Sequence, residues 1–166
     1  PMDNWTWNVA WFSDPVFLGE YPKEGLEKFA PYLPEITKED MELIHQPLDF
    51  MGQNIYNGYM IRCGKDGKPE YVDRAPGAAK TGTGWPVTPE ALYYGIRFLT
   101  ERYHLPLYIT ENGMSDLDNI SADGQVHDSE RITFLDAYLG AVQRAVNEGM
   151  PPLISITPSV FKDGRT

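Results

Sequence analysis

The sequence predicts an α/β fold built on a parallel β-sheet, and three observations support this prediction. Segments with the composition of short strands alternate with helical segments, in the order expected of βαβ units. The longer helical segments repeat apolar residues every three or four positions. Polar side chains stand at the C-terminal ends of the predicted strands, where the functional residues of parallel sheets gather.

The first predicted element is a short helix over residues 13–19. Ser13 or Asp14 is a suitable N-cap, and Pro15 would then occupy the first helical position, where its missing N–H costs nothing. Gly19 follows at the expected exit. These residues together predict one or two helical turns.

A second helix and the first strand follow. Thr37, with Asp40 three residues later, comes close to a capping box and predicts a helix over 36–45. The apolar and aromatic segment 48–56 predicts a buried strand that ends near Asn54.

Residues 57–87 are rich in glycine, proline and lysine. The segments "YMIR" and "YVDR" flank a Gly-rich turn and predict a β-hairpin. The rest, including Trp85, predicts a long loop, and long loops in compact domains are usually functional or mobile.

The remainder alternates helix and strand. Thr88 as N-cap and Pro89 at the first helical position predict a helix over 88–103, and a strand is expected over 105–110. Asp128 should cap a long helix that Gly149 ends, and 151–157 has the composition of one more strand. The apolar faces expected for the two helices consist of Leu92, Ile96, Leu99 and Tyr103 in the first, and Ile132, Leu135, Leu139, Val142 and Val146 in the second.

Composition excludes several classes of function. The 166 residues carry a formal net charge of −10, which argues against nucleic-acid or anionic membrane partners. A single cysteine, Cys63, and histidines at no ligand spacing predict neither a disulfide nor a metal site. No signal peptide or membrane span is expected, so a cytoplasmic location is the simplest expectation. Aromatic residues reach 13%, and in an acidic chain they favour sugars as ligands.

Glu111, in the segment "YITENG", is the candidate catalytic carboxylate. Tyr108, Ile109 and Thr110 favour a strand, so Glu111 is expected where the strand ends, with Asn112 and Gly113 as turn residues. If the strands share one parallel sheet, Tyr56 can donate a hydrogen bond to Glu111, which would orient it and favour its charged form. Such a carboxylate suits attack on an anomeric carbon, although a solvated acid at a strand end explains most glutamates of this kind.

A retaining glycosidase also needs a second carboxyl group about 5 to 5.5 Å from the first. The candidates in this chain are poor. Asp49 lies before the end of its strand and is expected to be buried or paired. Asp116 and Asp118 lie on the loop after Glu111, where solvated acids are the normal case.

Five segments, taken together, resemble family 1 of the glycoside hydrolases, the β-glucosidase family. Each is similar to a family motif, and all five stand in the family's order. They are "WFSDPVFLGEYP" (11–22), "ITKEDMELIHQPLDFMGQNIY" (36–56), "GWPVTPEAL" (84–92), "LPLYITENG" (105–113) and "HDSERITFLDAYL" (127–139).

The resemblance implies a (β/α)8 barrel and retaining hydrolysis of β-glucosides without a cofactor. Glu111 matches the family's nucleophile, Tyr56 the tyrosine that contacts it, and Asn54 an asparagine of the cleft. Trp85 either lines the aglycone side or packs as a loop tryptophan on the barrel rim. Asp128 and Arg131 also match, and we expect them to cap the helix and anchor the loop before it.

The chain also departs from the family's pattern. The resemblance covers only the C-terminal part of the family's sequence, and the Asn-Glu-Pro acid/base motif does not occur in this chain. The family's pattern is lost after about residue 149. Ile55 replaces the first tyrosine of the usual Asn-Tyr-Tyr. We therefore expect a single partial barrel domain over 1–166, roughly the C-terminal half of a barrel, as a truncated or rearranged product, an engineered or proteolytic fragment, or one half of a split enzyme.

The predicted function is that of a fragment of a retaining β-glucosidase of carbohydrate metabolism, with little or no activity alone. One alternative is a non-catalytic carbohydrate-binding or interaction fragment. Another is a family member with a different sugar preference, such as a 6-phospho-β-glucosidase or a β-galactosidase type. A β-glucoside or oligosaccharide is the expected ligand, and uncovered sheet edges predict a homo-oligomer or pairing with an N-terminal half.

Overall fold

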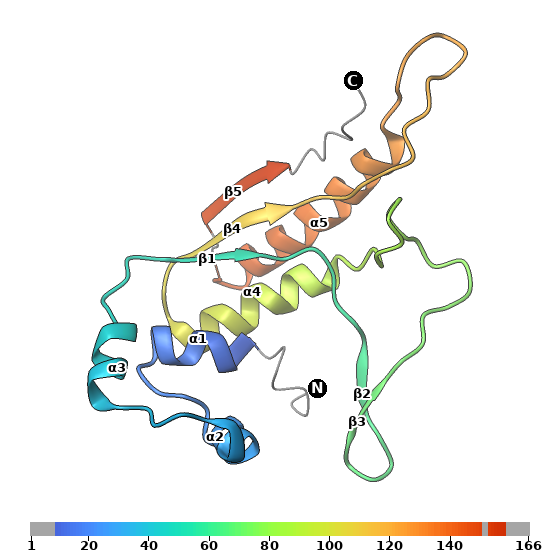
Figure 1. Ribbon diagram of the computed structural model, residues 1–166. Helices are drawn as coiled ribbons and strands as arrows, with labels where there is room; N and C mark the ends of the chain where they lie inside the picture. The colour runs from blue at the N-terminus through green and yellow to red at the C-terminus, as the bar shows by residue number, and fades with distance from the viewer. Residues whose placement is uncertain (1–8, 151–152, 159–166) are drawn as a thin grey trace. The chain divides into compact units, whose positions relative to one another are not determined.

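A computed structural model describes residues 9–150 and 153–158 of the chain. Contacts within the chain group it into two compact units that divide between Asp49 and Phe50. The first unit is helical, and the second holds the sheet and the candidate site (Figure 1).

The first unit contains four short helical elements. They are α1 (Val9–Phe17), α2 (Lys23–Phe29), η2 (Ala30–Tyr32) and α3 (Lys38–Ile44). Trp11 of α1 packs against the rings of Tyr21 and Phe29, with both centroid distances 4.8 Å. The predicted capping box is confirmed, because the Thr37 hydroxyl accepts from the Asp40 N–H and the Asp40 carboxylate accepts from the Thr37 N–H.

The helix predicted over 13–19 is present, but its predicted start is wrong. α1 begins at Val9, so Pro15 lies inside the helix and neither Ser13 nor Asp14 is the N-cap. Ala10 and Asp14 lie one turn apart and are both buried, so packing of that face outweighs the cost of an internal proline. Gly19 ends the segment with φ +77°, as its predicted exit role requires.

The second unit is built on a three-stranded parallel sheet in the order β1-β4-β5. Its strands are β1 (Met51–Asn54), β4 (Leu107–Asn112) and β5 (Leu153–Pro158). β1 is shorter than predicted but ends at Asn54, as expected. The predicted hairpin is also confirmed as β2 (Ile61–Cys63) and β3 (Pro69–Tyr71), which pair antiparallel. The first two residues of the strand predicted over 151–157 lie outside the described residues.

Helices α4 (Glu90–Tyr103) and α5 (Ser129–Asn147) pack against each other and lie behind the sheet in Figure 1. They bury the core of this unit. Its members are Leu92, Tyr93, Ile96, Leu99 and Tyr103 of α4, Phe134, Tyr138, Val142 and Ala145 of α5, and Met51, Leu107 and Ile109 of the sheet. The face predicted for α4 is therefore confirmed.

The face predicted for α5 is wrong. Of the five residues proposed, Val142 is buried, whereas Ile132, Leu139 and Val146 are 65%, 45% and 43% exposed. The helix carries apolar residues on two faces, and the face with Phe134 and Tyr138 is the buried one, in a helix that packs against α4. Periodicity alone cannot choose between two such faces.

The predicted starts of the two long helices, α4 and α5, hold to within two residues, but the capping side chains act differently. Pro89 is the N-cap of α4, and the Thr88 hydroxyl accepts the N–H of Gly58 instead of a helix N–H. Asp128 is the N-cap of α5, but its carboxylate accepts from Arg131. Arg131 also donates to Asp118 over 2.6 Å, so it anchors the preceding loop as expected.

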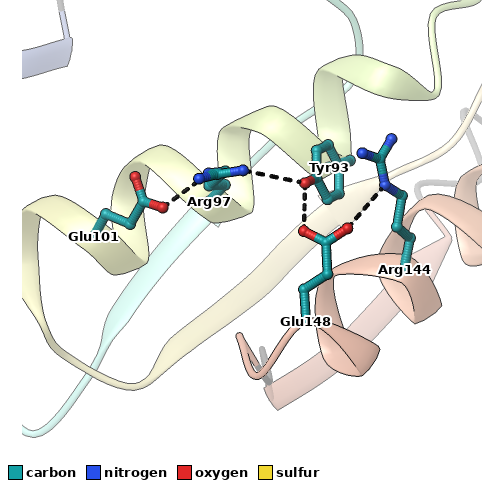
Figure 2. Close-up of polar contacts among 5 residues, drawn as sticks. All are labelled: Tyr93, Arg97, Glu101, Arg144 and Glu148. Atoms are coloured by element: carbon teal, nitrogen blue, oxygen red, sulfur yellow. Dashed lines mark hydrogen bonds and ion pairs between the residues drawn. The ribbon is translucent and has the colours of Figure 1, made fainter.

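A polar cluster joins the C-terminal end of α5 to α4 (Figure 2). The buried phenol of Tyr93 donates to Glu148 over 2.5 Å, and Arg144 donates to the other oxygen of Glu148 over 3.1 Å. The Arg144 guanidinium lies 3.8 Å from the centroid of the Tyr93 ring. Arg97 links Tyr93 to Glu101 on the exposed side of α4. The hydrogen bond from Tyr93 and then that from Arg144 lower the pKa of Glu148 below its ordinary 4.5.

The lowered pKa of Glu148 predicts a pH dependence of stability. The contribution of the charged carboxylate is complete above about pH 4.5, the pKa expected in the unfolded chain, and disappears as the pH falls through the lower pKa of the folded chain. Glu148→Gln should therefore lower the melting temperature at neutral pH, and the difference from the wild type should vanish in acid. Thermal unfolding between about pH 7 and pH 3 measures this.

Glu101→Gln is the matched control, since it alters a neighbouring carboxylate that is paired with the exposed Arg97. Exposed pairs at this spacing contribute little. The prediction would be contradicted if the loss of melting temperature in Glu148→Gln stayed constant down to pH 3. It would also be contradicted if this loss at neutral pH were no larger than the loss in Glu101→Gln.

No helix among the described residues is long and apolar enough to span a membrane.

Candidate active site

Glu111 lies within β4 and not after it. The strand extends to Asn112, two residues beyond the predicted end, because Glu111 stays paired with Asn54 of β1 on one side and Thr157 of β5 on the other. The carboxylate is therefore carried by a strand that is paired on both sides. Such a position holds a side chain more rigidly than a loop does.

A register shift at Thr110 sets the direction of Glu111. Ile109 pairs with Gln53 and Ile154, and the next paired residue on both sides is Glu111, so Thr110 is passed over. Ile109 and Asn112 are buried, whereas Thr110 is exposed and Glu111 half-buried. The regular alternation of buried and exposed side chains along the strand is thus broken at the residue before the carboxylate. β-Bulges near active sites often break the alternation in this way.

Tyr56 donates its phenol hydrogen to Oε2 of Glu111. The sequence predicted this contact and the structure confirms it, although Tyr56 lies two residues beyond the end of β1. Both residues are half-buried, so the pair is only partly exposed to water. A single hydrogen bond from a half-buried phenol limits the rotation of the carboxylate.

The main chain of Ile55 ties the Tyr56 segment to β4. Its N–H donates to the Glu111 carbonyl over 3.1 Å, and its carbonyl accepts from Nδ2 of Asn112 over 2.7 Å. The side chain of Ile55 approaches Gly95 of α4, where an added Cβ would lie 3.0 Å from Cδ1. The residue that departs from the family's usual tyrosine therefore packs against a helix.

Asn112 was expected to form a turn with Gly113, and the structure contradicts this. Asn112 is 0% exposed, and it holds the Ile55 carbonyl from inside the core. Among the described residues, its Oδ1 is a buried side-chain oxygen that lacks a hydrogen-bond partner. Only one half of the amide is satisfied, so the bond to Ile55 is what compensates its burial.

Trp85 packs edge-on against Tyr56, with 5.6 Å between ring centroids and 67° between ring planes. Its side chain is 47% exposed. The contact with Tyr56 agrees with packing on the rim, and the exposed half of Trp85 agrees with lining the aglycone side, so the structure does not choose between these two alternatives.

The loop that carries Trp85 is fixed to the loop after Glu111. The N–H of Gly82 donates to the Ser115 carbonyl over 2.8 Å, and the Thr83 N–H donates to the Ser115 hydroxyl over 3.1 Å. A Cβ on Gly82 would lie 3.0 Å from the Asp116 main chain, so glycine is needed for this close approach. Buried Thr81 accepts the Trp85 N–H over 3.1 Å.

Asn54, the second predicted binding residue, lies on the same rung as Glu111 and is exposed. Its Oδ1 accepts from the Thr110 hydroxyl over 2.6 Å. Oδ1 is thereby fixed, which leaves the Nδ2 group as the donor that can face a ligand. The structure thus brings Glu111, Tyr56, Asn54 and Trp85 to one end of the sheet.

The sequence of residues 2–156 matches the family described as glycosyl hydrolase family 1. The chain belongs to this family. The resemblance found in the motifs is therefore confirmed.

Several curated proteins are similar to this family 1 chain. β-Glucosidase A of Thermotoga maritima is 40% identical over 147 residues, which cover 87% of this chain and 32% of the relative. The β-glucosidase of an Agrobacterium species is 38% identical, covering 84% of this chain and 31% of the relative. An aryl-phospho-β-D-glucosidase of Bacillus subtilis is 31% identical, covering 89% and 33%. The chain thus spans about a third of the length of these relatives.

A solved structure gives the same relationship. The β-glucosidase from Thermotoga maritima in complex with castanospermine matches with a TM-score of 0.76 and 38% sequence identity. The match covers 90% of this family 1 chain and 34% of the solved chain. The fold is therefore part of a (β/α)8 barrel, as predicted.

Sequence reasoning missed three features of the site. These are the register shift at Thr110, the buried amide of Asn112 and the phenol of Tyr138, which donates to the Tyr56 carbonyl over 2.8 Å. The only signal for Tyr138 was a tyrosine among apolar residues of a helix, since a buried phenol needs a partner. Nothing in the sequence named that partner.

Proposed function

We propose that this chain carries the nucleophile of a retaining β-glucosidase, with Glu111 as the attacking carboxylate. The observation that supports the proposal best is the Tyr56–Glu111 pair, held at the C-terminal end of two parallel strands in a chain of family 1. In barrels of this kind, active sites lie at that end of the strands.

The reaction proceeds in two displacements. A Glu111 oxygen bonds to the anomeric carbon while the bond to the aglycone oxygen breaks, and a carboxylic acid group gives that oxygen its proton. Water then attacks the anomeric carbon, loses a proton to the same group, and Glu111 is released as a carboxylate. Tyr56 orients the nucleophile, and Asn54 and Trp85 are proposed to contact the substrate.

The acid/base group must come from outside this sequence, because no Asn-Glu-Pro occurs in it. General acid or base catalysis contributes about 10² to 10⁴-fold to such reactions. The chain alone should therefore turn over ordinary β-glucosides very slowly or not at all. We also propose that the exposed apolar stripe of Ile132, Leu139 and Val146 is covered by a further part of the barrel or by a second copy of the chain.

The sugar preference is proposed from the relatives. Those named above include β-glucosidases and an aryl-phospho-β-D-glucosidase. We rank a terminal β-D-glucoside as the first candidate substrate and a 6-phospho-β-D-glucoside as the second. We also propose that the protein acts in carbohydrate metabolism in the cytoplasm. Neither sugar requires a cofactor in this chemistry.

The test is covalent labelling with 2,4-dinitrophenyl 2-deoxy-2-fluoro-β-D-glucoside. Its leaving group needs no proton, so the absent acid is bypassed, and the fluorine slows release of the sugar. Intact mass spectrometry should show one added glycosyl group, and peptide mapping should place it on Glu111.

Glu111→Ala is the control. The labelling rates with the 6-phosphorylated fluoroglucoside and with the corresponding fluorogalactoside, compared with the rate for the fluoroglucoside, measure the sugar preference. A folded chain that stays unlabelled, or label that persists in Glu111→Ala, would refute Glu111 as the nucleophile. Tight binding of glucose without labelling would favour the non-catalytic alternative.

A further inference from the structure

Tyr56 lies in an irregular segment, so the direction of its side chain depends on how its main chain is held. β1 ends at Asn54, and residues 55–60 belong to no helix or strand. Ile55 is tied to β4 by Glu111 and Asn112, as described above. Those bonds hold one side of the segment only.

The other side is held by Tyr138 of α5. Its hydroxyl donates to the Tyr56 carbonyl over 2.8 Å and accepts the N–H of Thr88 over 2.9 Å. Thr88 in turn accepts the Gly58 N–H over 3.0 Å. The segment from Tyr56 to Gly58 is therefore fixed to the start of α4 through one phenol and one hydroxyl.

Tyr138 is itself rigid. Its side chain is 1% exposed, and its ring stacks on Phe134 with 3.9 Å between centroids and 19° between planes. Burial raises the pKa of the phenol above its ordinary 10.0, so it remains a neutral donor at physiological pH. A fixed, protonated phenol makes a reliable tie between two main-chain groups.

We propose that Tyr138 is a positioning residue for the Glu111 carboxylate and acts through the main chain of Tyr56. The chain of contacts runs from Thr88 through Tyr138 to the Tyr56 carbonyl, and from the Tyr56 phenol to Glu111. Helix α5 thus takes part in orienting a side chain carried by β4. The inference rests on the proposed role of Glu111 as the nucleophile.

The competing explanation is that Tyr138 merely satisfies core main-chain groups. Tyr93 provides the comparison, because it is 2% exposed, lies in the same helix pair, and also uses its hydroxyl for a long-range bond. That bond goes to Glu148 at the far end of α5 and not to the Tyr56 segment. Tyr93→Phe therefore matches Tyr138→Phe in chemistry and burial but not in its connection to Glu111.

The test follows the hydroxyl proton of Tyr56 by NMR in the full chain, with assignment from its loss in Tyr56→Phe. In the wild type it should resonate downfield and exchange slowly, as a proton bonded to a carboxylate does. Tyr138→Phe should shift or broaden this resonance, and Tyr93→Phe should leave it unchanged. The rate constant of labelling by the fluoroglucoside should fall about five- to tenfold in Tyr138→Phe with little change in probe affinity, since misdirection of a reactive group costs rate more than binding.

The proposal would be overturned if the Tyr56 hydroxyl resonance were unchanged in folded Tyr138→Phe, or if Tyr138→Phe and Tyr93→Phe changed it equally. It would also be overturned if the wild type had no slowly exchanging Tyr56 hydroxyl proton. Should Tyr138→Phe fail to fold, hydrogen exchange of the Thr88 amide in the wild type decides. Protection equal to that of core amides supports the tie, and free exchange overturns it.

The outcomes also separate this inference from the proposed function. If no form of the chain is labelled, Glu111 fails as a nucleophile, while the Tyr56 resonance still reports whether Tyr138 positions the pair. If the wild type is labelled and Tyr138→Phe is labelled equally fast with an unchanged resonance, the function stands and the role of Tyr138 is refuted.

Discussion

Tyr56→Phe is expected to slow labelling of Glu111 by the fluoroglucoside roughly 10- to 100-fold, because a reactive group displaced by about 1 Å can lose on the order of 10²-fold in rate. The phenol is the side-chain donor that holds the carboxylate, and without it Glu111 samples more than one orientation. The edge-on packing of Trp85 on the ring should persist, since phenylalanine keeps the ring. Time-resolved intact mass spectrometry at several probe concentrations measures the rate constant and the affinity separately.

Tyr59→Phe is the matched control for this experiment. Tyr59 lies on the same segment, but its side chain is 70% exposed and packs against Tyr71 of the hairpin. The Tyr59→Phe variant should be labelled at Glu111 at the wild-type rate. Equal rates in the wild type and Tyr56→Phe would show that the hydrogen bond does not set the geometry of attack.

Asn112→Ala is expected to lower the free energy of unfolding by about 1–3 kcal/mol, the cost of leaving a buried polar group without its partner. The substitution removes the bond to the Ile55 carbonyl in a place that water does not reach. The same bond fixes the segment that carries Tyr56, so labelling of Glu111 should also slow. Urea denaturation followed by circular dichroism gives the stability change.

Asn119→Ala tests whether burial is responsible. The Asn119 amide also donates to a main-chain carbonyl, that of Leu117, over 3.0 Å, but it lies on an exposed loop. Its loss should change stability by no more than about 0.5 kcal/mol. If the two variants lost equal stability, the structural role given to Asn112 would be wrong.

The parallel sheet and the main contact of the site could be predicted from sequence because they depend on local patterns. Asn54 and Glu111 each follow a short apolar run in the sequence, and parallel strands end on the same side of a sheet. Placing Asn54 and Glu111 at strand ends was therefore enough to predict that Tyr56, two residues after Asn54, lies near Glu111. The capping box of Thr37 and Asp40 is equally local, since it needs only residues three positions apart.

The features that could not be predicted depend on partners distant in sequence. The register shift at Thr110 exists only in relation to the two neighbouring strands, and a single strand read by itself contains no sign of it. Asn112 next to Gly113 is typical of a turn, yet the Ile55 carbonyl, 57 positions away, holds its amide in the core. The buried face of α5 was misassigned for the same reason, because α4 selects between its two apolar faces.

The bond between Tyr138 and Tyr56 also bears on how the chain folds during synthesis. The two residues are 82 positions apart, and at translation rates of about 5–20 residues per second the ribosome needs roughly 4 to 16 s to pass from one to the other. Early in that interval β1 has emerged without its neighbour β4, and α5, which holds the segment after β1, emerges only at its end. The exposed edge of β1 is then a place where a nascent chain invites mispairing or a chaperone, and the geometry around Glu111 is among the last features to be established.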